Sequence, residues 1–236
     1  MRRLVRDIRG VAMLEFAFVA PLVLLTGCFG VEIANYALAQ LRVSQIALAL
    51  ADNASRVGIS SSLATQQLRE VDIADVLQAT RTQGQRINIT KYGRVTLSSL
   101  EADAAGAQRI RWQRCLGLMT GPDYVSHFGA TSPTDGSDTT SANDGYNGLD
   151  PAGDSIASNG MGPIGGKVEA PPQSGVMFVE VNYQYRPLFG SWLVGTRRIH
   201  YIASFIVRDR RDFAQIFNPN PQVAVGDKLT CNRFTV

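Results

Sequence analysis

The chain has 236 residues, of which 45% are hydrophobic and 18% charged, and its formal net charge is +3. Residues 1–9 contain four arginines and one aspartate, which accounts for that whole net charge and leaves the rest of the chain neutral. Because nucleic-acid binding requires clustered positive charge on the folded part, this distribution argues against a nucleic-acid partner. The length suffices for a membrane helix plus one or two small domains.

An apolar segment follows the arginine-rich arm. Residues 10–31 contain a single charged side chain, Glu15, and match the roughly 20 residues that a helix needs to cross a bilayer. The arginines precede this segment and Glu32 follows it. The positive-inside rule therefore places the N-terminus in the cytoplasm and the bulk of the chain outside. We expect a single transmembrane helix at 11–31.

Glu15, the fifth residue after Gly10, is the most informative side chain of this segment. A carboxylate in a membrane helix costs about 2.5–3.5 kcal/mol on insertion scales, so such a residue usually has a partner or a function. The alternative is a glutamate that snorkels to the membrane surface and has no further role. Pro21 predicts a kink that neighbouring helices tolerate, with no separate function.

Several interpretations of this N-terminus remain open. An uncleaved signal-anchor fits all of the observations above. A cleaved secretory signal fits poorly, because the apolar character continues well past a core of about 7–15 residues. The sequence LTGC at 25–28 matches the lipobox of a lipoprotein acylated at Cys28. The residues after Cys28, however, continue a helical pattern and form no polar spacer.

The helix is expected to continue beyond the membrane, because residues 32–57 contain neither proline nor glycine. Their polar side chains share one face and their apolar side chains fill much of the remainder, which is an amphipathic pattern. The polar set is Asn35, Arg42, Gln45, Asp52 and Arg56, and the apolar set is Ala34, Leu38, Leu41, Ile46, Leu48 and Leu50. With a stop at Gly58, the whole helix would be about 70 Å long. Its outer half would carry a globular domain or contact other subunits.

Residues 59–236 are expected to form an exported domain. A helix is predicted at 63–81, and alternating patterns predict strands at 86–90, 94–100, 109–116, 176–185 and 199–207. A hairpin turn is predicted at Lys91-Tyr92-Gly93. This order indicates an α+β fold, in which a small antiparallel sheet packs on the long N-terminal helix.

The stretch 121–166 has ten glycines, six aspartates and no lysine or arginine. It is too polar to bury much apolar surface, so we expect a flexible, solvated loop. Its oxygen-bearing side chains could bind calcium, but their spacing fits no EF-hand, and no metal site is predicted. Those side chains are Asp135, Asp138, Asn143, Asp144, Asn147, Asp150 and Asp154.

The remaining chemistry-bearing residues are few. Cys115 and Cys231 lie in the exported, oxidising part of the chain and predict a disulfide, the alternative being two unrelated buried thiols. The two histidines, His127 and His200, have no metal-ligand spacing, and no catalytic motif occurs in a usable context. We therefore expect no catalytic residue, no cofactor and no enzymatic activity.

The sequence RGVAMLEFAFVAPL at 9–22 resembles the TadE-like family of minor pilins (pseudopilins) from bacterial tight-adherence, or Flp, pilus systems. Pilin-like precursors have a basic leader, a glycine before the cut, a long apolar helix and a glutamate at the fifth mature position. Residues 1–32 match each of these features. The similarity continues at 32–38, 44–47 and 50–56, and more weakly at 93–100, 112–115 and 181–189.

The resemblance implies that a prepilin peptidase removes leader 1–10 by cutting between Gly10 and Val11 on the cytoplasmic side. It also implies that Glu15 pairs with the free N-terminal amine of a neighbouring subunit, which would offset part of the desolvation cost of both charges and favour one register. The implied partners are this peptidase, other pilin-like subunits, the pilus assembly machinery and the inner membrane. The implied location is the bacterial inner membrane, with the C-terminal domain in the periplasm.

Overall fold

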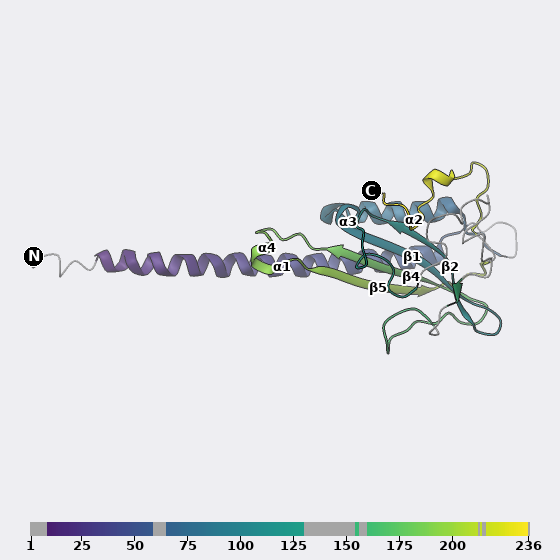
Figure 1. Ribbon diagram of the computed structural model, residues 1–236, viewed down its shortest axis with the longest axis horizontal. Helices are drawn as coiled ribbons and strands as arrows, with labels where there is room; N and C mark the ends of the chain where they lie inside the picture. Colours follow the sequence, from purple (N-terminus) through teal and green to yellow (C-terminus); the bar gives the residue numbers. More distant parts are fainter. Residues whose placement is uncertain are drawn as a thin grey trace, which may run out of the picture. The chain divides into compact units, whose positions relative to one another are not determined.

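The computed structural model describes residues 9–58, 65–129, 154–155, 160–211, 213 and 216–235. The chain divides into two compact units, one containing Met1–Gln40 and Tyr185–Arg197, the other containing Leu41–Gln184 and Arg198–Val236. The long helix α1, Arg9–Arg56, runs through both units, and the sheet belongs to the second (Figure 1). The fold is therefore α+β, as expected: a long N-terminal helix carries a small antiparallel-sheet domain.

Helix α1 spans 48 residues and continues through Pro21. It ends two residues before Gly58, whose φ of +152° favours glycine, so the expected stop signal lies at the observed end. The final turn leaves carbonyl groups without helical partners, and the buried guanidinium of Arg211 donates to three of them. These acceptors are the carbonyls of Ala54 at 3.2 Å, Ser55 at 3.3 Å and Val57 at 2.7 Å.

From Leu41 onward, α1 buries one stripe of side chains against the domain. The buried positions recur every three or four residues, which is the spacing of one helix face: Val43, Ile46, Ala47, Leu50, Ala51 and Ala54. Of the apolar residues expected on this helix, Ile46 and Leu50 are in the core, whereas Leu41 and Leu48 are 52% and 42% exposed. The amphipathic pattern predicted the helix but did not distinguish its two apolar faces.

The sheet has the order β3-β2-β1-β4-β5, and all of its neighbouring strands are antiparallel. The central strands β1 (Gly93–Ala102) and β4 (Gly175–Gln184) pair with Val95 opposite Val181. Strands β2 (Gln108–Leu116) and β5 (Arg198–Ile206) flank them, and β3 (Asp154–Ser155) adds a short edge. The four longer strands confirm the predictions at 94–100, 109–116, 176–185 and 199–207.

The helix predicted at 63–81 is present but begins later, and two predictions that follow it, a strand and a hairpin turn, were wrong. Helix α2 covers Glu70–Gln83, so it begins later than the predicted 63–81. The chain just before it is extended, since Arg69 bridges to Phe217, and the Asp72 carboxylate accepts the Arg69 N–H at 3.0 Å to start the helix. Apolar spacing alone does not reveal that local cap.

Residues 86–90, predicted as a strand, form instead the 3₁₀-helix η2 (Gln85–Ile87) and the beginning of the short helix α3 (Ile89–Tyr92). The Lys91-Tyr92-Gly93 hairpin turn is also absent, because α3 runs directly into β1. The reason is Asn88, whose left-handed backbone (φ 51°, ψ 50°) breaks any extended run. Ile87 and Ile89 are both buried by this compact turn, which mimics the alternation of a strand.

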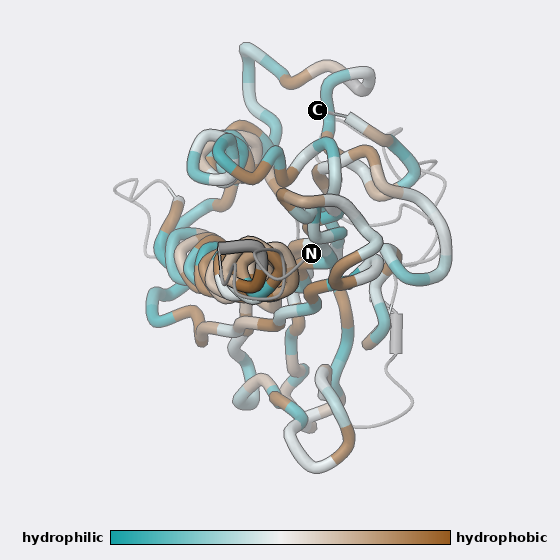
Figure 2. Tube along the Cα trace, turned by 90° about the vertical axis from the view of Figure 1, so that its left-hand side faces the viewer, coloured by the Kyte–Doolittle hydropathy of each residue, from teal (hydrophilic) through white to brown (hydrophobic). Residues whose placement is uncertain are grey.

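The two faces of the sheet are covered differently. Helix α2 and the part of α1 from Leu41 onward cover one face (Figure 1, Figure 2). The other face is covered by irregular segments around Phe128 and Met161, which pack with Phe178 of β4 in one apolar cluster. Residues 160–166 of the stretch expected to be a flexible loop thus contribute a fully buried side chain, Met161.

The residues considered for calcium lie outside the described part of the chain, except for the backbone of Asp154 in β3. They are Asp135, Asp138, Asn143, Asp144, Asn147 and Asp150. The leader residues 1–8 also lie outside it. The predictions that concern these residues remain predictions.

Candidate functional site

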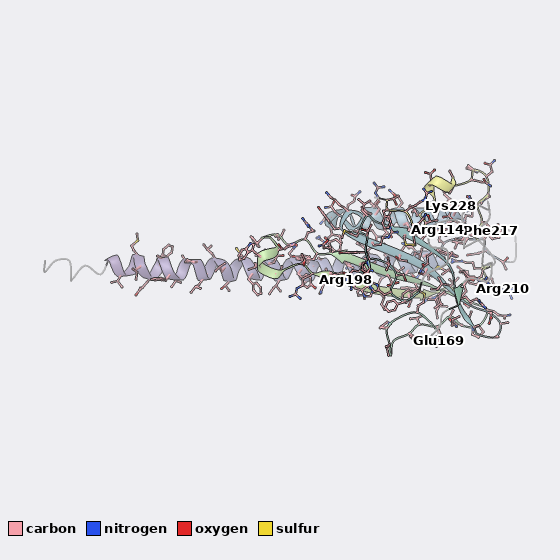
Figure 3. All side chains as sticks on the ribbon, viewed as in Figure 1. Arg114, Glu169, Arg198, Arg210, Phe217 and Lys228 are labelled. Atoms are coloured by element: carbon pink, nitrogen blue, oxygen red, sulfur yellow. A yellow bond between two sulfur atoms is a disulfide. The ribbon has the colours of Figure 1, made fainter. Side chains whose placement is uncertain are left out.

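The apolar part of α1 presents its side chains outward. Among the described residues, α1 is the one helix long and apolar enough to cross a membrane, and none of its most apolar stretch is buried. Met13 is 74% exposed and Phe16 71%, and Figure 3 shows side chains projecting from both visible edges of this helix. Viewed end-on in Figure 2, the helix is coloured largely apolar. A helix of this kind is compatible with a single-pass membrane anchor.

The predicted processing residues lie at the beginning of this helix. Gly10 and Val11 are in its first turn, and Glu15 is exposed one turn further along. Val11 and Glu15 are four residues apart and so lie on the same helix face. Pro21 and the half-buried Cys28 both lie within the continuous helix.

A second carboxylate, Glu32, marks the outer end of the apolar segment, and it is completely buried. One carboxylate oxygen accepts the Tyr185 hydroxyl. The other accepts the backbone N–H groups of Leu188 at 2.9 Å and Phe189 at 3.1 Å. Three donors thus satisfy the charge inside the chain, which is how a buried carboxylate is tolerated.

Tyr185 is the hub of this contact, which we call the Glu32 clasp: Glu32, Asn35, Tyr36, Tyr185 and the backbone of 188–189. The Tyr185 hydroxyl accepts the Asn35 side-chain amide at 2.7 Å, and the Tyr185 ring meets Tyr36 edge-on at 5.0 Å. Sequence reasoning treated Glu32 only as the charge that ends the apolar run. The one sequence feature that could have indicated this contact is the long connection between two strands at residues 185–197. A simple hairpin turn would need far fewer connecting residues.

The connection Tyr185–Arg197, which we call the β4–β5 loop, carries the short helix α4 (Ser191–Val194) and exposes large apolar side chains. Trp192 is 69% exposed, Leu188 62% and Phe189 40%. The loop is closed at its base, where the Tyr185 N–H donates to the Arg197 carbonyl at 2.8 Å. A fastened loop with three exposed apolar residues is unusual for a surface that faces only water.

A polar cluster on the sheet brings together the two histidines. Glu180 of β4 is almost fully buried, and one of its oxygens lies 3.5 Å from His127 Nδ1 and 3.7 Å from His200 Nε2. The same carboxylate accepts the His127 backbone N–H at 3.0 Å and the Ser126 hydroxyl. Residue spacing did not predict this cluster, because the two histidines are far apart in the chain: His200 is on β5, and His127 lies in an irregular segment that returns to the sheet.

Two imidazoles and a carboxylate form a donor set that transition metals use. Here, however, the Arg198 guanidinium lies 3.3 Å from His127 Nε2. The same Arg198 Nη1 donates to the Asp123 carbonyl at 2.6 Å and to the Asn182 side-chain oxygen at 3.1 Å, so a hydrogen-bonded guanidinium already occupies this side of the cluster. We therefore interpret the cluster as a hydrogen-bonded network that fixes residues 126–128 to the sheet. Figure 3 labels Arg198, the residue on which this assignment depends.

The C-terminal segment is tied to the sheet by a disulfide and by an arginine. Cys115 of β2 is bonded to Cys231, as expected. The buried guanidinium of Arg94 donates to the carbonyls of Gly117, Cys231 and Arg233 at 2.6–2.7 Å, and burial lowers its pKa to about 10. The Phe234 ring lies 4.4 Å from the same guanidinium. A cavity of about 470 Å³ beside the disulfide is lined mainly by apolar atoms.

Comparison of the chain with family models, with curated proteins and with solved structures gives no match. The function is therefore argued from the chain's own residues. The features that demand an explanation are the outward-facing apolar helix with Glu15 and the clasp that follows it.

Proposed function

We propose that this chain is a non-catalytic, TadE-like minor pilin that acts in the assembly of a tight-adherence, type IV-like pilus. The observation that carries the proposal is the arrangement of α1. An apolar helix exposes its side chains, holds one carboxylate at the fifth position after Gly10, and continues without a break into the domain. A plain membrane anchor does not need that carboxylate, which is costly in a bilayer.

The proposed maturation is hydrolysis of the Gly10–Val11 peptide bond by a prepilin peptidase. One water is consumed; Gly10 leaves with a carboxylate on the ten-residue leader, and Val11 becomes the N-terminal amine of the mature chain. At neutral pH an α-amino group is largely protonated, since its ordinary pKa is about 8. Processing would therefore create a cation at the inner end of a helix that already carries Glu15.

In an assembly of such helices, Glu15 would pair with the Val11 amine of a neighbouring subunit. Each charge is costly in an apolar environment, and pairing offsets part of that cost. Because the pair forms at one axial stagger only, it would also select the register between adjacent helices. The exposed Leu41 and Leu48 of α1, which the domain leaves uncovered, would extend the same interface beyond the membrane.

The proposed location is the bacterial inner membrane, with a cytoplasmic N-terminus and a periplasmic domain. The arginines before the apolar helix support this orientation. The Cys115–Cys231 disulfide supports export as well, because such bonds persist in oxidising compartments such as the periplasm. The proposed partners are the prepilin peptidase, other pilin-like subunits and the pilus assembly machinery.

The alternative is an uncleaved, signal-anchored periplasmic protein with a binding or structural role. The structure is equally compatible with such an anchor, so the two differ in whether residues 1–10 are removed and in whether Glu15→Ala abolishes assembly while membrane insertion persists. A lipoprotein acylated at Cys28 has less support, because Cys28 lies within a helix that continues for many residues on both sides.

The decisive experiment is N-terminal sequencing and intact mass of the protein from its native membrane. We expect a mature chain that starts at Val11 and retains its helix. A Gly10→Val variant should accumulate as full-length precursor, whereas Gly30→Val is a matched control, since the space around Gly30 is open. A chain that starts at Met1 in the wild type would refute maturation, and an acylated Cys28 would establish the lipoprotein.

A further inference from the structure

We propose that the β4–β5 loop is a membrane-interface finger: Leu188, Phe189 and Trp192 insert into the headgroup region of the bilayer that α1 of the same chain crosses. This inference rests on the proposed membrane anchoring but is independent of processing and of pilus assembly. It assigns a lipid surface to three exposed apolar side chains that the proposed function does not use.

The first argument is position. Residues 11–31 form a helix of about 32 Å at about 1.5 Å per residue, which matches a hydrocarbon core of about 30 Å. Glu32 is therefore at the boundary where the helix leaves the hydrocarbon. Its carboxylate is hydrogen-bonded to the backbone of Leu188 and Phe189, so these residues lie within one side chain's length of that boundary. Figure 1 shows α4 beside α1 at this level.

The second argument is chemistry. Tryptophan and other aromatic residues concentrate at membrane interfaces, where an apolar ring contacts acyl chains and a polar edge contacts headgroups. Trp192, Leu188 and Phe189 provide the apolar part, and Arg186 and Arg197, both exposed, stand at the two ends of the loop. Arginine side chains at this depth can reach phosphate groups while their stems cover apolar surface.

The third argument is rigidity. The Glu32 clasp fixes the first part of the connection to α1, since Tyr185 contacts Glu32, Asn35 and Tyr36, and the bond from the Tyr185 N–H to the Arg197 carbonyl closes the base of the loop. A loop held this way presents its apolar residues at a defined depth. This explains why a carboxylate is buried at the edge of the bilayer: the hydrogen bonds of Glu32 hold the loop at the membrane surface. The chain then has two contacts with the bilayer, the helix and the loop.

The test uses the fact that the chain has two tryptophans, one in the loop and one in the domain core. Trp112 is 3% exposed, so a Trp112→Phe variant reports on Trp192 alone, and a Trp192→Phe variant reports on Trp112 alone. Each full-length protein is reconstituted into vesicles of phosphatidylethanolamine and phosphatidylglycerol. Tryptophan emission is then quenched either by lipids brominated near the headgroup end of the acyl chain or by aqueous acrylamide. Flotation of the vesicles confirms insertion independently.

We expect brominated lipid to quench Trp192 several-fold more strongly than Trp112 and acrylamide to quench it weakly. Glu32→Gln should reduce the lipid quenching of Trp192, because a neutral amide holds the two N–H groups less well. If Trp112→Phe fails to fold, the difference between the wild type and Trp192→Phe gives the same quantity.

Three outcomes would overturn the inference, and they are distinguishable. A chain that fails to float with vesicles refutes the anchor itself and, with it, the proposed function. A floating chain whose Trp192 is quenched by acrylamide and not by brominated lipid refutes only the interface role of the loop. Protection of Trp192 that grows with the protein-to-lipid ratio, without lipid quenching, would show that a second copy of the chain covers the loop instead.

Discussion

The Arg114–Glu70 ion pair gives the sharpest quantitative prediction for the domain. Arg114 Nε and Nη2 donate to the two Glu70 oxygens at 2.8 and 2.9 Å, joining β2 to the first residue of α2. Both side chains are at most 3% exposed, and Arg114 is labelled in Figure 3. Removing one partner of such a pair leaves an uncompensated buried charge and typically costs about 3–5 kcal/mol. We therefore expect Arg114→Met to lose that much unfolding free energy.

The assay is urea unfolding of the full-length protein in nanodiscs at neutral pH, followed by Trp112 fluorescence in a Trp192→Phe background. The matched control is the Asp52–Arg56 pair, whose N–O distance is 2.7 Å but whose arginine is 63% exposed. Solvent screens this pair, so Arg56→Met should cost no more than about 0.5 kcal/mol. The double variant Glu70→Leu with Arg114→Met should recover much of the single-variant loss, since it removes both charges together. A loss below about 1 kcal/mol for Arg114→Met, or additive losses in the double variant, would refute the reasoning.

Three further predictions concern pH, the disulfide and assembly. Burial raises the pKa of Glu101 to about 7 against an ordinary 4.5, so the folded chain holds a proton that the unfolded chain releases. Stability should fall on the order of 3 kcal/mol as pH rises from about 4.5 to 7, and Glu101→Gln should flatten this slope in urea titrations. Cys231→Ser opens a bridge between residues 116 positions apart and should cost about 4–5 kcal/mol by the chain-entropy model; an unchanged denaturation midpoint would contradict this. Glu15→Ala should abolish filament assembly, scored by electron microscopy, while membrane insertion persists, whereas Met13→Ala on the same exposed helix should assemble normally.

The sequence predicted the features that are encoded locally. An apolar run with one charged residue and the absence of glycine and proline from 32–57 suffice to predict α1, and partly alternating, β-branched-rich segments suffice for the four longer strands. Residues 86–90 were predicted wrongly because Ile87 and Ile89 alternate like a strand although Asn88 adopts a left-handed turn. Alternating apolar residues indicate which side chains are buried, but a compact turn can bury the same side chains as a strand.

The site was less predictable because its parts are distant in the chain. The Glu32 clasp joins residues about 150 positions apart, and the cluster around Glu180 needs both the pairing of β4 with β5 and the return of the irregular segment 126–128 to the sheet. The spacing of residues along the sequence does not predict contacts between residues so far apart. A charged residue that follows an apolar helix is, by itself, indistinguishable from an ordinary helix flank.

The two glutamates of the apolar part of α1, Glu15 and Glu32, have different surroundings. Glu32 has its hydrogen bonds supplied by Tyr185 and by the backbone at 188–189, so its charge is compensated before any partner arrives. Glu15 is exposed on a helix whose neighbours are apolar, and the described residues place no such set of donors around it. In a bilayer the first carboxylate is therefore a stable structural element, whereas the second remains costly until a cation reaches it. That asymmetry assigns Glu32 to the architecture of the single chain, and it is the physical reason for the proposal that Glu15 acts in a contact between subunits.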